Sequence, residues 1–170
     1  MCLLIFTAIY LLVAFFLINW DNLKKYYPTI QYYVICNSLY NVLFYNHTLW
    51  EYRPGRTHWL NHTVIDLIFS LLIVPVAIYF YLHFLPEGKK QIIYIAGWVS
   101  LFTMIEVFFH RKGLFVYHNG WNEKWSFLFD IILFTILRIH YQNYRKALLL
   151  SVPIAAILLW FFHPSFSELK

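Results

Sequence analysis

The stretch that decides the fold is TVIDLIFSLLIVPVAIYFYLHFL, at residues 63–85. It is long enough to cross the roughly 30 Å hydrocarbon core of a bilayer, which takes about 20 helical residues. Its one carboxylate is Asp66. Pro75 is tolerated in a membrane helix, because neighbouring helices can satisfy the carbonyl that it frees. The stretch therefore predicts a transmembrane helix with an ionisable group inside it.

Five further apolar runs of similar length accompany this one. The full set is residues 2–19, 29–46, 63–85, 91–109, 125–141 and 147–163. Of the 170 residues, 61% are hydrophobic and only 12% are charged, whereas a soluble domain has about 25% charged residues. We therefore expect one all-α domain over residues 1–170, a polytopic membrane protein with a bundle of about six transmembrane helices.

The positions of the basic residues indicate how the chain is oriented in the membrane and whether it binds lipid or nucleic acid. The loops after the first, third and fifth runs contain seven of the 13 Lys and Arg residues, one more than the opposite side. The uncharged N-terminus, followed by Lys24 and Lys25, favours a chain that starts outside the cytoplasm. The formal charge of +5 is too dispersed along the chain for a nucleic-acid-binding surface. The expected partner is therefore the lipid bilayer.

Three carboxylates lie inside the apolar runs, namely Asp66, Glu106 and Asp130. An ionisable group inside a bilayer costs several kcal/mol unless it is paired or wetted, so each is a functional candidate. Asp66 and Asp130 lie near the starts of their helices and Glu106 near the end of its own, which places all three near one membrane face. Asn37 and Asn41 are four residues apart, so they share a helix face that we expect to point into the bundle.

Histidines extend this candidate site. His62 and Asp66 are four apart at a helix start, and Glu106 and His110 are four apart at a helix end, so each pair can share a face. The candidate metal ligands are His62, Asp66, Glu106 and His110, with Asp130 and His118 as further members of the site. Such nitrogen and oxygen donors suit a divalent metal such as Zn, Mn or Fe, and the same groups suit a proton relay. No catalytic or cofactor fingerprint is present.

Structural roles are the alternative for several of these residues. Thr63 and Asp66 fit a capping box at a helix start. Asp130 has a candidate buried partner in Arg138 or in an asparagine of the second run. The tryptophans of the two long loops fit an aromatic belt at the membrane interface. They are Trp50, Trp59, Trp121 and Trp125.

A series of polar and aromatic motifs runs along most of the chain. In order they are Tyr27-Pro28-Thr29, Leu39-Tyr40-Asn41, Leu49-Trp50-Glu51-Tyr52, Asn61-His62-Thr63 with Asp66, Glu106, and Gly113-Leu114-Phe115 with Tyr117-His118-Asn119-Gly120-Trp121. In this order they resemble a family of uncharacterised small polytopic membrane proteins from spore-forming Firmicutes, mainly bacilli and clostridia. The resemblance implies a bacterial cell membrane and a helical bundle. The resemblance implies no particular activity and identifies no catalytic residue.

Three functions are open from the sequence. The first is a non-enzymatic membrane protein that binds or passes a cation, a proton or a small polar solute through the acidic and histidine-bearing site. The second is a membrane-embedded enzyme acting on a lipid or isoprenoid-like substrate, with carboxylates as acid and base or as metal ligands. The third is a scaffold or assembly factor. Because one subunit of this size has little room to enclose a pathway for an ion or solute by itself, we expect a homo-oligomer.

Overall fold

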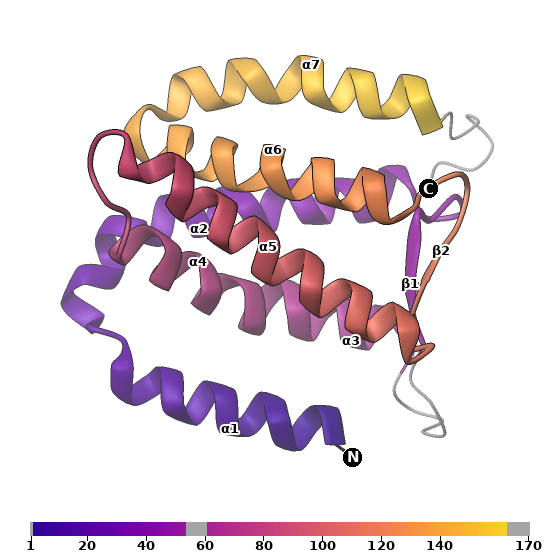
Figure 1. Cartoon of the computed structure of the whole chain (residues 1–170), viewed down its shortest axis with the longest axis horizontal. Helices are drawn as coiled ribbons and strands as arrows, with labels where there is room; N and C mark the ends of the chain where they lie inside the picture. The colour runs from indigo at the N-terminus through magenta and orange to yellow at the C-terminus, as the bar shows by residue number, and fades with distance from the viewer. Residues whose placement is uncertain (1, 54–60, 163–170) are drawn as a thin grey trace.

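The computed structural model describes residues 2–53 and 61–162 and shows a bundle of helices with a short strand pair at one end (Figure 1). The helices are α1 (Cys2–Leu17), α2 (Trp20–Leu43), α3 (His62–Ile68), the π-helical segment η1 (Phe69–Ile73), α4 (Val74–His83), α5 (Lys90–Arg111), α6 (Glu123–Gln142) and α7 (Tyr144–Phe162). The strands are β1 (Trp50–Tyr52) and β2 (Phe115–Tyr117). The expected all-α class is confirmed.

Three helical stretches of the described chain are long and apolar enough to cross a membrane: His62–His83, Lys90–Arg111 and Tyr144–Phe162. The first runs through α3, η1 and α4. By contrast, α1 has only 16 residues, and α2 and α6 include charged and polar residues along their length. Large apolar side chains point outward on the long apolar helices, including Ile93 at 78% exposure and Leu149 at 75%. Such exposed apolar faces suit a lipid environment.

The start of α2 corrects the sequence prediction, because the helix begins at Trp20 rather than at residue 29. Asn19 caps it by accepting hydrogen bonds from the backbone N–H groups of Asp21 and Asn22 at 3.1 and 3.3 Å. Pro28 lies inside the helix on its exposed side, where the carbonyl that it frees stays accessible to solvent. Lys24 therefore lies within the first turns of a helix and not in a loop.

Pro75 changes the hydrogen-bonding pattern of the helix formed by the third predicted run. It has no N–H to donate, so the α-helical ladder is interrupted, and the turn before it widens into the π-helical segment η1. Such single π turns often occur at functional sites. The carbonyl of Ile73, at the end of η1, accepts a hydrogen bond from the Tyr10 hydroxyl of α1 at 3.1 Å. Ser70 of η1 is buried and faces the interior.

The two long loops meet in an antiparallel strand pair that the sequence did not predict. Its register pairs Trp50 with Tyr117, Glu51 with Val116, and Tyr52 with Phe115. Because β1 follows α2 and β2 follows α5, both loops lie at one end of the bundle, and the turn at Gly88 lies at the other (Figure 1). A chain of six spans requires this common end, because two spans separate the loops; Pro54 itself lies outside the described residues.

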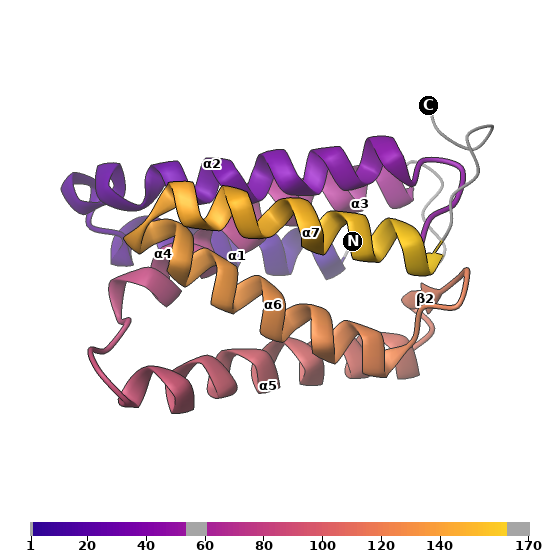
Figure 2. The ribbon, with the colours of Figure 1, turned by 90° about the horizontal axis from the view of Figure 1, so that it is seen from above.

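Two apolar cores hold the helices together. One lies away from the strands and is centred on Tyr79, Tyr81 and Phe134, each no more than 1% exposed. The other lies under the strand pair and contains Trp121 and Phe162. Helix α6 contributes to both cores and lies between α5 and α7 (Figure 2). Helix α6 is therefore the element that brings the candidate residues of α5 and of the loops together.

Candidate functional site

Asp66 of α3 lies at the centre of a cluster of amide and hydroxyl groups and is only 8% exposed. Its Oδ2 accepts hydrogen bonds from Asn41 Nδ2 at 2.8 Å, Ser70 Oγ at 3.3 Å and Asn37 Nδ2 at 3.5 Å. Asn37 also donates to Ser70 at 2.7 Å. The expectation that Asn37 and Asn41 point into the bundle is confirmed. We call these four residues the amide cluster, in which every donor to the carboxylate is neutral.

The capping role considered for Asp66 is wrong. Helix α3 begins at His62, and its N-cap is Asn61, whose Oδ1 accepts a hydrogen bond from the Val64 backbone N–H at 3.0 Å. Asp66 therefore lies in the second turn, beyond the position from which a capping box closes. Asparagine is a stronger N-cap than threonine, which explains why Asn61 and not Thr63 begins the helix.

Glu106 of α5 and Asp130 of α6 form the second polar group, which we call the acid pair. The two carboxylates interact electrostatically across neighbouring helices. Glu106 Oε1 accepts a hydrogen bond from the Tyr117 hydroxyl at 2.6 Å, and Asp130 Oδ2 accepts one from the Thr103 hydroxyl at 3.2 Å. Asp130 is 7% exposed, and the Ser126 hydroxyl lies beside Glu106. Both carboxylates therefore depend on hydroxyl donors.

No ion pair to either carboxylate occurs within residues 2–53 and 61–162. His110, one turn after Glu106, interacts with it electrostatically, but its Nδ1–H donates to the Phe115 carbonyl at 2.9 Å. Glu123 adds a further negative charge near Glu106. The acid pair thus has like charges around it and lacks a lysine or arginine partner in the described chain.

Arg138, which the sequence offered as a partner for Asp130, does not pair with it. Arg138 lies eight residues further along α6, which is about 12 Å at the helical rise per residue. Its Nε is buried without a hydrogen-bond partner in the described structure. That pairing is therefore wrong, and the donor to Asp130 is Thr103.

Two of the candidate histidines, His62 and His118, form hydrogen bonds with groups other than the three candidate carboxylates. His62 Nδ1 accepts a hydrogen bond from the Tyr52 backbone N–H at 3.1 Å. His118 Nε2 contacts Glu51 Oε2 at 3.0 Å and so links the two strands. Among the described residues, no group of three or more His, Cys, Asp and Glu side chains is placed to hold a metal ion. The structure therefore does not gather the three histidines into one site: His110 lies beside Glu106, whereas His62 and His118 bond to Tyr52 and Glu51.

The strand pair closes the site from the end of the bundle. Tyr52 of β1 stacks on Phe69 with ring centroids 5.0 Å apart, and it interacts electrostatically with both Asp66 and Glu106. Burial raises the pKa of Tyr52 well above its usual range. Burial also raises the pKa of Tyr117, and the hydrogen bond to Glu106 raises it further. Tyr117 is therefore a protonated donor to Glu106 at neutral pH.

Trp121 supports the acid pair through Ser126 and is not a belt residue. It is 5% exposed, and its Nε1–H donates to Ser126 Oγ at 2.7 Å. Trp50 likewise stacks on Tyr40, with ring centroids 4.3 Å apart. Trp125 is partly buried in the same core, and Trp59 lies outside the described residues. The supporting roles of Tyr117, Ser126 and Trp121 were missed, and the one sequence signal was the β-forming run Phe115-Val116-Tyr117.

Comparisons of the chain with protein-family models, with curated proteins and with solved structures find no match. The functional argument therefore rests on the geometry of the acid pair and of the amide cluster.

Proposed function

We propose that this chain is a multi-pass membrane protein that binds a proton or a small monovalent cation at the acid pair. The observation behind the proposal is the environment of Glu106 and Asp130, two mutually repelling carboxylates with hydroxyl donors and no lysine or arginine partner in the described chain. Burying such charge uncompensated costs several kcal/mol. A proton or a cation bound at the acid pair removes this cost.

The amide cluster supports the same function from the neighbouring helices. Asp66 has three neutral donors on one oxygen, which stabilise a negative charge without neutralising it. Tyr52 interacts electrostatically with both Asp66 and Glu106, so it lies within electrostatic range of both groups. We assign Asp66 the role of a second acidic position on the path of the ion, reached from the strand end of the bundle.

A six-span arrangement in a bacterial cell membrane completes the proposal. The three long apolar helices support the membrane location, and the resemblance to the Firmicutes family supports the cell membrane. Lys24, Lys25, Lys89, Lys90, Arg145 and Lys146 all belong to the turns or helix ends opposite the strands. Such an excess of basic residues favours the cytoplasmic side. In this arrangement the acid pair lies toward the outer leaflet.

Labelling by an apolar carbodiimide tests this function, because the reagent reacts with protonated carboxyl groups inside membranes. We expect mass spectrometry of the purified protein to find adducts on Glu106 or Asp130 at neutral pH. These adducts should decrease when the pH is raised or, for a cation site, when sodium replaces choline in the buffer. Glu87 and Glu123, which are exposed, are the control carboxyls. Equal labelling of all four residues, unaffected by pH or sodium, would contradict the proposal.

Cysteine accessibility tests the six-span arrangement. In a background with Cys2→Ser and Cys36→Ser, Arg53→Cys and Lys124→Cys should react with a membrane-impermeant maleimide from one side, and Glu87→Cys from the other. These exposed positions avoid Gly88 and Gly120, whose positive φ angles disfavour a side chain. Reaction of positions 53 and 124 from opposite sides would exclude the arrangement.

A further inference from the structure

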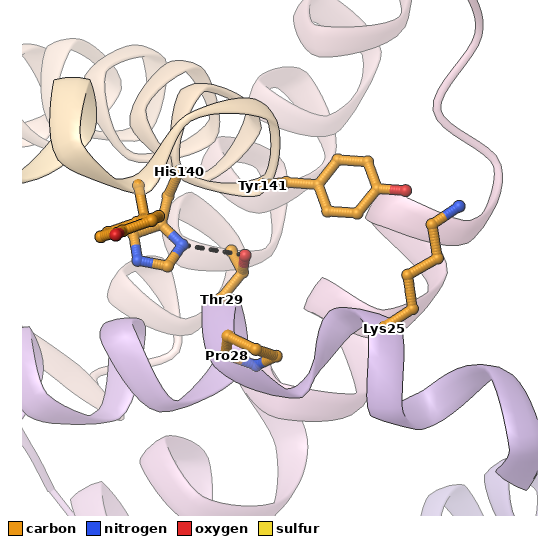
Figure 3. A pocket seen from close by; sticks show the side chains of 6 residues that line it. Lys25, Pro28, Thr29, His140 and Tyr141 are labelled. Carbon is orange, nitrogen blue, oxygen red and sulfur yellow. Dashed lines mark hydrogen bonds between the residues drawn. The ribbon is translucent and has the colours of Figure 1, made fainter.

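A second polar site lies at the end of the bundle opposite the strands, where α2, α6 and α7 meet. A pocket of about 370 Å³ opens there (Figure 3). It is lined by Lys25, Pro28, Thr29, His140, Tyr141 and Tyr144. This volume falls in the range of small-molecule sites, roughly 300–1,000 Å³. We call it the Lys25 pocket, and none of its lining residues is acidic.

Two cations contact tyrosines of the pocket, and one of them, Lys25, is itself a lining residue. Figure 3 shows the Lys25 ammonium next to the Tyr141 hydroxyl, and Lys25 Nζ lies 5.5 Å from the centre of the Tyr141 ring. The hydrogen bond with Tyr141 raises the pKa of Lys25, which keeps the ammonium charged. Arg145 Nε donates to the Tyr144 hydroxyl at 3.2 Å. Lys25 therefore brings positive charge to the lining of the pocket, and Arg145 adds a second charge beside the lining residue Tyr144.

Two further lining residues, Thr29 and His140, are polar, buried and hydrogen-bonded to each other. Thr29 is 2% exposed, and its hydroxyl bonds to His140 Nδ1 at 3.0 Å. The His140 ring stacks on Tyr32, with centroids 4.3 Å apart and an angle of 17° between the rings. A buried hydroxyl and a buried imidazole thus line the pocket together with Lys25. Because they bond to each other, with a neutral imidazole they keep one free N–H or O–H donor, and this donor and the Lys25 ammonium are complementary to an oxyanion.

We propose that the Lys25 pocket binds the phosphate group of an anionic ligand at the membrane surface. An ammonium bonded to one tyrosine keeps two further N–H donors for phosphate oxygens, and lysine is a common phosphate ligand in proteins. Lys24, Lys25, Arg145 and Lys146 flank apolar runs, which places the pocket at the depth of lipid headgroups. The phosphate comes either from a phospholipid headgroup or from a water-soluble phosphate.

Native mass spectrometry of the full chain in detergent tests this proposal with two probes, phosphatidylglycerol and inorganic phosphate. Lys25→Gln should weaken binding of the better probe roughly tenfold, as expected for loss of a charged hydrogen bond. The matched control is Lys24→Gln, one residue away and exposed, which should change binding by less than about fivefold. Lys25→Arg should restore binding, and Tyr141→Phe, which removes the contact that orients Lys25, should weaken it.

The two probes distinguish the sources of the phosphate. Retention of phosphatidylglycerol that depends on Lys25 supports a lipid headgroup, and Lys25-dependent binding of inorganic phosphate alone supports a soluble ligand. If the wild type binds neither probe, or if Lys24→Gln and Lys25→Gln weaken binding equally, the pocket is not a phosphate site. The acid pair is at the other end of the bundle, so this result does not depend on the proposed ion site.

Discussion

Glu106→Gln and Asp130→Asn should each abolish proton or cation binding and leave the free energy of unfolding unchanged, or raise it by about 1 kcal/mol or less. Either change removes one of two like charges, and the new amide still accepts the hydrogen bond from Tyr117 or Thr103. Thermal unfolding in detergent gives the stability. Calorimetric titration with sodium, at several pH values, gives the binding.

Asp66→Asn is the matched control for these two variants. Its carboxylate accepts three hydrogen bonds from neutral donors, so loss of the charge should lower stability by about 1–3 kcal/mol. A large loss of stability in the acid-pair variants would instead assign the acid pair a structural role. If Glu106→Gln and Asp130→Asn each cost about 3–5 kcal/mol, as when one partner of a buried ion pair is removed, and folded protein still binds the ion, the proposal is wrong.

Trp121→Ala should be among the most destabilising single substitutions in the chain, at about 3–5 kcal/mol. The indole is 5% exposed and packs on Trp50 and Phe162, with ring centroids 5.4 and 5.0 Å away. Its removal opens a cavity under the strand pair and leaves Ser126 without its N–H donor. The midpoint of thermal unfolding in detergent measures the loss.

Phe6→Ala is the control for this substitution, because Phe6 is an aromatic residue of α1 that is 71% exposed. Its replacement should change the free energy of unfolding by about 0.5 kcal/mol or less. Equal losses for Trp121→Ala and Phe6→Ala would show that the core under the strands does not contribute to stability as the structure indicates.

The helical class and one polar helix face of the site could be predicted from local sequence pattern. Apolar runs of membrane length predicted the helices, and the spacing of Asn37 and Asn41 predicted a shared face. The structure gives that face its partner, Asp66. The start of α2 could not be predicted, because the exposed Pro28 interrupts the helix less than the sequence suggests.

The contacts of the acid pair with its hydroxyl donors could not be predicted, because a local sequence pattern does not say how helices and loops pack together. Which residue faces Asp130 is decided by how α5 packs on α6, and the answer is Thr103 rather than Arg138. The strands β1 and β2 have three residues each and lie far apart in sequence. Strands this short show no usable periodicity. The donor Tyr117 was therefore assigned to a loop, and its contact with Glu106 was missed.

Infrared spectroscopy of the purified protein measures the state of the acid pair most directly. In sodium-free buffer at neutral pH, the wild type should show the C=O stretch of a protonated carboxyl group, and both Glu106→Gln and Asp130→Asn should lose it. Asp66→Asn should keep it. For a cation site, sodium should remove the band from the wild type. If the wild type shows no such band and its carboxylate bands do not respond to sodium, the acid pair holds neither a proton nor a cation, and the central claim is contradicted.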